Sequence, residues 1–128
     1  MSSATPALPT PSQGEIWVVK LPTEPPDKGL RFVVIVSTDA QNHHPRATTV
    51  LVVPLSTTLS NADRLRLSPG ETGLREPSEI WANGITTIRK ETLRLPRQQL
   101  RKLSHGKVCE IAKYVIRAMG VFPEEIAR

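Results

Sequence analysis

Short apolar runs rich in β-branched residues constrain this fold more than any other feature of the sequence. Residues 32–36 read Phe-Val-Val-Ile-Val, and residues 50–53 read Val-Leu-Val-Val. Continuous apolar runs of this length are typical of strands that are buried on both faces. Residues 22–30, between the expected strands at 15–21 and 31–37, contain three prolines and a glycine and must form a loop. The sequence therefore predicts a mainly-β protein.

Strand boundaries follow from changes in the residue pattern. Pro54 cannot donate a ladder hydrogen bond, so it indicates a strand end, an edge or a bulge. Asn83 and Gly84 separate the last two expected strands, where they could form either a type I′ hairpin turn or a kink within one strand. The expected strands cover residues 15–21, 31–37, 48–55, 64–67, 79–82 and 85–88.

One amphipathic helix is predicted near the C-terminal end of the sequence. Its apolar residues recur at helical spacing and form a single stripe. Ser104 can cap the start of this helix, and Gly120 suits the left-handed position after its last turn. Several short strands followed by one helix close most naturally as a small, partly open barrel with the helix packed on it. The stripe consists of Val108, Ile111, Ala112, Val115, Ile116 and Met119.

Length and hydropathy indicate the domain organisation. The 128 residues suffice for one domain, whose core must use Val, Ile and Leu because aromatic residues make up only 4%. We expect a disordered segment at residues 1–13, the folded domain at 14–122 and a tail at 123–128. The sequence has neither an apolar stretch of about 20 residues nor the pattern of a signal peptide, so a cytoplasmic location is expected.

Charge and potential metal ligands narrow the range of partners. The net charge of +5 favours an anionic partner such as nucleic acid or an acidic protein segment. Three His and one Cys lack the spacing of a metal site, so neither a metal nor another cofactor is expected. Cys109 cannot form an internal disulfide, and its place near the apolar stripe predicts a buried thiol.

Several segments resemble, in the same order, those of the MazF/PemK family of toxins. They are a Gly-Glu-Ile-Trp start, an Arg that leads into the second strand, an apolar strand ending in Pro-Leu-Ser-Thr, an Ile-Thr-Thr-Ile stretch, and a helix ending in Met-Gly. Together the matches extend over about residues 14–120, at positions 14–17, 29–39, 50–57, 85–88 and 103–120.

This resemblance implies a fold, an activity and a set of partners. The family fold is an SH3-like barrel with a C-terminal helix, which agrees with the strand pattern. Members of the family are metal-independent, sequence-selective endoribonucleases that cut single-stranded RNA, in which the ribose 2′-hydroxyl attacks the adjacent phosphate. A homodimer and an acidic, partly disordered antitoxin are the further implied partners.

The resemblance also assigns roles to individual residues. It places the key arginine at Arg31 and the key hydroxyl at Ser56. A guanidinium can hold two phosphate oxygens at once, and a hydroxyl can donate to a phosphate oxygen or orient the nucleophile. The expected RNA-binding residues are Lys28, Thr57, Asn83 and Thr86.

Asn83 departs from the family pattern, because many members carry Asp or Glu at that place. A carboxylate there could act as a general base, and an amide cannot. The base therefore lies elsewhere, or catalysis depends on Arg31 and Ser56, or the protein is slow or inactive. His43 and His44 are the nearest imidazoles in sequence, within a polar connection.

Two other functions fit the same fold. One is a catalytically degenerate module that binds RNA or protein. The other is a gyrase-poison toxin of the CcdB kind, whose members end in Trp-Gly-Ile. This sequence ends in Val-Phe-Pro-Glu-Glu-Ile-Ala-Arg, which disfavours the gyrase reading.

Overall fold

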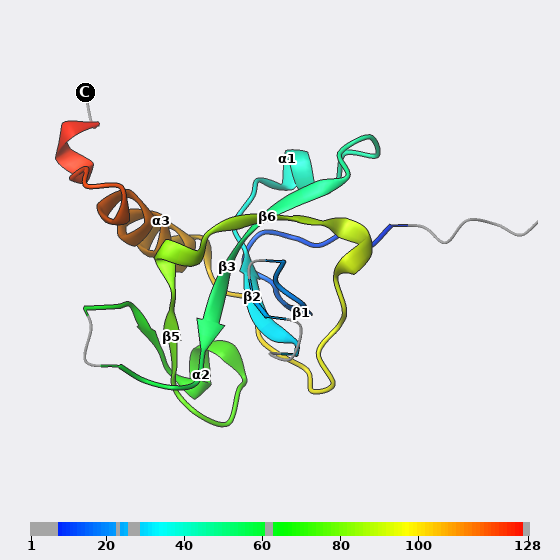
Figure 1. Ribbon diagram of the computed structural model, residues 1–128, viewed down its shortest axis with the longest axis horizontal. Helices are drawn as coiled ribbons and strands as arrows, with labels where there is room; N and C mark the ends of the chain where they lie inside the picture. The colour runs from blue at the N-terminus through cyan, green and yellow to red at the C-terminus, as the bar shows by residue number, and fades with distance from the viewer. Residues whose placement is uncertain (1–7, 23, 26–28, 61–62, 127–128) are drawn as a thin grey trace, which may run out of the picture.

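The computed structural model describes residues 8–22, 24–25, 29–60 and 63–126, and a six-stranded sheet forms its centre (Figure 1). The strands follow the order β1-β2-β3-β5-β4, while β6 also pairs with β3, and every ladder is antiparallel. Their bounds are Ile16–Val19 (β1), Arg31–Ile35 (β2), Thr49–Ser56 (β3), Arg66–Leu67 (β4), Ser78–Ile80 (β5) and Thr86–Arg89 (β6).

The mainly-β class with a C-terminal helix is confirmed, and the sheet remains open. β1 and β4 are its two ends, and no ladder between described residues joins them. The segment around Asn83 and Gly84 is a 3-10 turn, η2 (Ala82–Gly84). A type I′ turn needs positive φ at both central residues, and neither residue has it. Because β5 and β6 each pair with β3, η2 is a kink along the edge of β3 and not a hairpin.

Apolar side chains pack on both faces of the sheet, as the continuous runs predicted. Val34 lies in one cluster, and its neighbours Val33 and Ile35 lie in the other. The first cluster lies between the sheet and the C-terminal helix and includes Leu103 and Ile111. The second consists of Val19, Leu21, Val33, Ile35, Val50, Val52, Ile88 and Leu93, with Trp17 packed against it.

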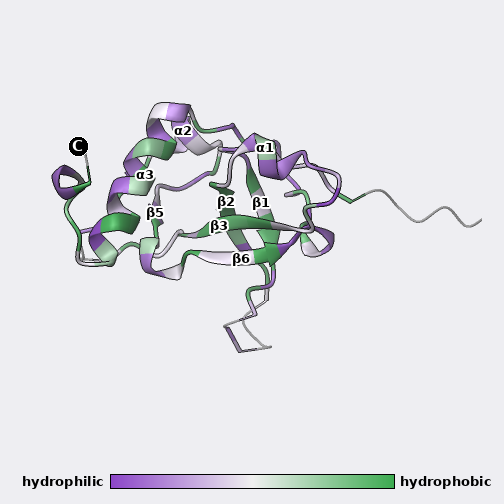
Figure 2. Ribbon diagram, turned by 90° about the horizontal axis from the view of Figure 1, so that it is seen from above, coloured by the Kyte–Doolittle hydropathy of each residue, from purple (hydrophilic) through white to green (hydrophobic). Residues whose placement is uncertain are grey.

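The long helix, α3 (His105–Ala118), begins and ends where the sequence predicted. Lys107 N donates to Ser104 Oγ at 3.1 Å, and Gly120 has φ +80° after the last turn. Figure 2 shows α3 near β5, at the end of the molecule away from β1. Shorter helices lie outside the expected strands and the long helix: α1 (Asp39–Asn42), α2 (Pro69–Thr72), η3 (Lys90–Thr92) and η4 (Pro123–Glu125).

The apolar stripe of α3 is only partly covered. Val108 and Ile111 are buried, whereas Ala112 and Met119 are exposed. The prediction of a buried Cys109 was wrong, because this side chain points to solvent beside the stripe. In the part of the chain that the structure describes, no helix is both long and apolar enough to cross a bilayer.

The predicted domain boundaries stay predictions, since residues 1–7 and 127–128 lie outside the described residues. Within the expected lead-in, Gln13 N donates to Asp39 Oδ1 at 2.7 Å, and Gln13 Nε2 donates to Val36 O at 3.0 Å. At the other end, η4 follows α3.

Candidate active site

The start of β2 and the end of β3 lie at the same end of the sheet. The β2–β3 register, carried two residues beyond its last pair, brings Arg31 level with Ser56. On the other side of β3, Ser56 pairs with Glu79 of β5, which pairs with Arg66 of β4. Cross-strand partners project from the same face of a sheet. The fold therefore aligns these four residues in one row.

Arg31 forms an ion pair with Glu24, which comes from the loop between β1 and β2. Arg31 Nη1 and Glu24 Oε2 are 3.5 Å apart, and the two side chains are 27% and 13% exposed. Among the described residues, neither Arg31 Nε nor Glu24 Oε1 has a hydrogen-bond partner, although both atoms are buried. Buried polar atoms without partners are rare in folded proteins. The pair therefore leaves one donor and one acceptor unsatisfied among those residues.

Ser56 closes a tight turn at the end of β3. Its Oγ donates to Thr58 O at 3.2 Å and accepts from Thr58 N, also at 3.2 Å. This is the ordinary role of a hydroxyl at a strand end. In this arrangement the hydroxyl proton of Ser56 is committed to Thr58 O. Thr57, the neighbouring residue that was expected to bind RNA, is exposed.

A second group of arginines surrounds Glu79, whose side chain is fully buried. Its carboxylate accepts from Ser60 N at 2.8 Å and from Ser60 Oγ at 3.0 Å, with Arg66 Nε at 3.6 Å and Arg64 Nη1 at 3.9 Å. Burial opposes ionisation, but the hydrogen bonds from Ser60 and the two arginine charges outweigh it. They hold the pKa of Glu79 below its ordinary value of 4.5.

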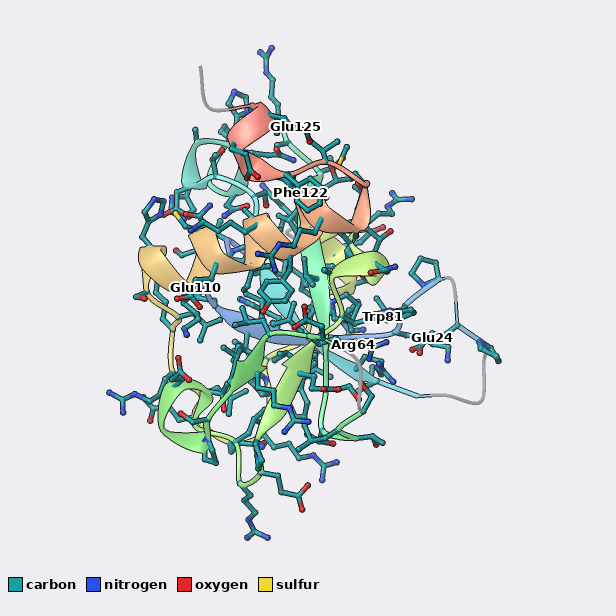
Figure 3. The ribbon with its side chains drawn as sticks, turned by 90° about the vertical axis from the view of Figure 1, so that its left-hand side faces the viewer. Glu24, Arg64, Trp81, Glu110, Phe122 and Glu125 are labelled. Carbon is teal, nitrogen blue, oxygen red and sulfur yellow. The ribbon has the colours of Figure 1, made fainter. Side chains whose placement is uncertain are left out.

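The remaining predicted RNA-binding residues are spread over the fold. Thr86 begins β6 and pairs with Val52 of β3. Val52 is four residues before Ser56 along the strand, which corresponds to about 13 Å. Asn83 is exposed on η2, where it and Arg64 help to line a cleft of about 210 Å³ between η2 and α3. In Figure 3, Arg64 lies near the centre of the view and Glu24 on the loop at its right. Lys28 lies outside the described residues.

The two histidines near Asp39 do not approach this row. They follow α1 and precede β3, whereas Ser56 is the last residue of β3. The length of β3 puts about 23 Å between its two ends. His43 Nε2 instead lies 3.1 Å from Ser12 Oγ. Among the described residues, no three His, Cys, Asp or Glu side chains gather in a way that could hold a metal ion.

Glu24 and Glu79 are two carboxylates of the site that the sequence patterns did not indicate. The family pattern pointed to a carboxylate at position 83 and not to the loop before Arg31. The available signal was topological, because a loop between antiparallel neighbours returns to the end of the sheet where the next strand begins. For Glu79 the signal was a carboxylate within a short apolar strand.

Comparisons with known proteins agree with this fold. The family model described as PemK-like, MazF-like toxin of type II toxin–antitoxin system matches residues 12–119. No curated protein matches the sequence. Among solved structures, an endoribonuclease in complex with its cognate antitoxin from a mycobacterial species is 22% identical, with a TM-score of 0.65, and the match covers 87% of this chain and 96% of that chain.

Two further solved structures are similar. The toxin MazF-mt6 of Mycobacterium tuberculosis is 21% identical with a TM-score of 0.64, and the match covers 84% of this chain and 97% of that chain. A MazE–MazF structure from Deinococcus radiodurans is 14% identical with a TM-score of 0.65, and the match covers 88% of this chain and 98% of that chain. At these identities the likeness shows the fold.

Proposed function

The chain belongs to the PemK-like, MazF-like toxin family of type II toxin–antitoxin systems, and from that premise we propose that it is a metal-independent, sequence-selective endoribonuclease. Its substrate is single-stranded RNA, whose bases can be splayed out and read. The observation that carries this proposal is the Arg31–Glu24 pair, with a buried donor and a buried acceptor that have no hydrogen-bond partner in the described part of the chain. We place its action in the cytoplasm, where messenger RNA is found.

The proposed reaction assigns one task to each member of the pair. The ribose 2′-oxygen forms a bond to phosphorus, and the bond from phosphorus to the 5′-oxygen of the next nucleotide breaks. Glu24 Oε1 takes the proton of the 2′-hydroxyl, and water supplies the proton that the departing 5′-oxygen needs. Arg31 donates to the non-bridging oxygens, where negative charge builds up. The products are a 2′,3′-cyclic phosphate and a 5′-hydroxyl.

Ser56 and the predicted RNA-binding residues complete the proposal. Ser56 exchanges its bond to Thr58 O for one to a phosphate oxygen when RNA binds. The loops at residues 22–30 and 57–64 flank Arg31 and Ser56, so they select the sequence that is cut. The residues that contact RNA are Lys28, Thr57, Asn83 and Thr86.

We also propose a twofold homodimer that forms through the incompletely covered side of α3. Ala112 lines a shallow apolar cleft of about 190 Å³ together with Val36, Leu51 and Ile85. Met119, further along the same stripe, is 72% exposed. A second copy would cover this apolar face. Met119→Glu should dissociate the dimer, and light scattering that shows a monomeric parent protein at micromolar concentration would contradict the proposal.

An acidic, partly disordered antitoxin is the proposed inhibitor. The chain carries a net charge of +5, and a flexible acidic segment can fold along a basic surface on binding. One similar structure is an endoribonuclease in complex with its cognate antitoxin, and another contains MazE with MazF. An acidic antitoxin segment should compete with RNA for this protein, and simultaneous binding of both would contradict the proposal.

Incubation of the purified protein with a long single-stranded RNA in EDTA tests the activity directly. We expect fragments that end in a cyclic phosphate and whose ends recur at one short motif. The second candidate is a binding module without catalysis, which Asn83 and the committed proton of Ser56 favour. RNA that is bound yet stays intact would support the binding module and contradict the enzyme.

A further inference from the structure

A cleft of about 370 Å³ lies along the outer edge of β1, and the proposed reaction does not use it. β1 is an end strand of the sheet, and on its outer side Val18 is bridged to Arg94. The chain then continues through residues 95–102 towards α3 (Figure 1). This segment and residues 15–17 enclose the cleft.

The cleft combines an indole, cations and amides. Trp17 Nε1 donates to Glu15 Oε1 at 3.2 Å, which fixes the orientation of the indole. Glu15 Oε1 also accepts from Ser12 N at 2.6 Å, so the one carboxylate of the cleft is already engaged. The remaining polar side chains of the lining are Arg97, Gln98, Gln99, Arg101 and Lys102.

The cleft is close to the proposed reaction centre. Trp17 lies opposite Val33 and Arg31 lies opposite Val19 in the β1–β2 ladder. Trp17 and Arg31 therefore project from the same face as diagonal neighbours, about 7–8 Å apart along the backbone. A shallow depression lined by residues 20, 30, 91, 92 and 94 lies beside the start of β2, where Leu30 precedes Arg31.

We infer that this cleft binds a base and the flanking phosphates of the RNA strand whose scissile phosphate lies at Arg31, an inference that rests on the proposed function. An indole accepts a stacked base, amides pair with base edges, and guanidinium and ammonium groups hold phosphates. An acidic protein segment would use the cations but would leave the amides and the indole without matched groups. The chemistry of the lining therefore favours single-stranded RNA.

The fluorescence of Trp17 tests this inference in a Trp81→Phe background, where Trp17 is the only tryptophan. The probe is a single-stranded 2′-O-methyl oligonucleotide, which lacks the hydroxyl that the reaction needs. We expect the oligonucleotide to quench Trp17. Arg97→Glu should weaken binding of the oligonucleotide about tenfold. Arg97→Ala should reduce the slope of the logarithm of the binding constant against the logarithm of the salt concentration by about one. The matched control is Lys113→Glu, an equal charge reversal on the exposed side of α3, which should not change the affinity.

Three outcomes would overturn the inference. The first is that Trp17 is not quenched, and the second is that both charge reversals weaken binding equally. The third is that a Glu-rich peptide quenches Trp17 and the oligonucleotide does not displace it, which would assign the cleft to an acidic protein. Because the oligonucleotide cannot be cut, these results do not depend on catalysis. Cleavage of unmodified RNA tests the proposed function separately.

Discussion

Two arginine–carboxylate groups lie beside Ser56, one on each side of it. They differ in how completely their hydrogen bonds are satisfied. The carboxylate of Glu79 is fully buried and accepts from the backbone and hydroxyl of Ser60 beside two arginines. Glu24 and Arg31 touch through one contact of 3.5 Å, and each has a buried atom without a hydrogen-bond partner among the residues that the structure describes. We propose that the satisfied group stabilises the fold and that the incompletely satisfied one takes part in the reaction.

The largest expected effect is that of Arg31→Ala on RNA cleavage. Loss of the group that stabilises charge in the transition state should lower the single-turnover rate about 10²–10³-fold, or roughly 3–4 kcal/mol. Arg31→Lys should recover little, because an ammonium lacks the planar fork. Denaturant unfolding should show a loss of about 1 kcal/mol or less, as partly exposed ion pairs contribute little. Cleavage by Arg31→Ala at the parent rate would remove Arg31 from the site.

Glu79→Gln should lower the stability of the fold and leave cleavage nearly unchanged, which is the opposite of what is expected for Arg31→Ala. It replaces a buried carboxylate oxygen by a donor that faces other donors, so the free energy of unfolding should fall by about 1–3 kcal/mol. Cleavage per folded molecule should change little. Glu110→Gln is the matched control, because Glu110 is exposed and pairs only at the surface with Lys107. Glu110→Gln should lower the free energy of unfolding by less than about 1 kcal/mol. Equal losses in the two variants would show that the Glu79 group does not stabilise the fold.

The contribution of the Glu79 carboxylate to stability should also depend on pH. The pKa of Glu79 in the folded protein lies below its ordinary value of 4.5. Its contribution is therefore fully present above pH 4.5 and is lost as the pH falls through the lower folded value. Hydrogen bonds also lower the pKa of Asp39 and Glu71, from the Gln13 backbone to Asp39 and from the Ser68 backbone to Glu71.

Glu79→Gln should therefore reduce the fall in stability below pH 4.5 without abolishing it. Thermal unfolding between pH 3 and pH 7 checks this, with the pH values chosen to span the ordinary pKa of 4.5. Parallel curves for the parent and the variant would contradict the assignment.

The smallest expected effect is that of Asn83→Asp. Because Glu24 already supplies a carboxylate beside Arg31, a new one on η2 should not raise the cleavage rate. It should weaken RNA binding slightly, since it adds negative charge near phosphates. Rates and affinities measured in parallel separate the two effects. A clear rise in the rate would mean that Asn83 marks a lost general base and that Glu24 does not act as one.

Most of the fold was predictable because local patterns determine it. The apolar run of β2, the Ser104 cap and the left-handed Gly120 all depend on neighbouring residues. The exposure of Cys109 was not predictable, because it depends on how α3 is rotated against the sheet. Likewise, the sequence left open whether residues 82–84 form a hairpin turn or a kink, and pairing with a distant strand decides it.

The candidate site was predictable only in part, because it too depends on contacts between residues that are distant in the sequence. The resemblance indicated Arg31 and Ser56, and the register of β2 and β3 brings them level. Glu24 comes from an irregular loop whose path no periodicity reveals. The environment of Glu79 depends on arginines from another segment, which the sequence does not place beside it.

We propose that the incompletely satisfied Arg31–Glu24 pair is the reactive one, and a comparison of Glu24→Gln with Glu79→Gln tests this proposal. Both are isosteric losses of one carboxylate, so single-turnover cleavage of the same RNA in EDTA can be compared per folded molecule. We expect cyclic-phosphate products from the parent, a loss of about 10²-fold for Glu24→Gln, and little change for Glu79→Gln. Parent-like cleavage by Glu24→Gln, or a larger loss for Glu79→Gln, would contradict the proposal.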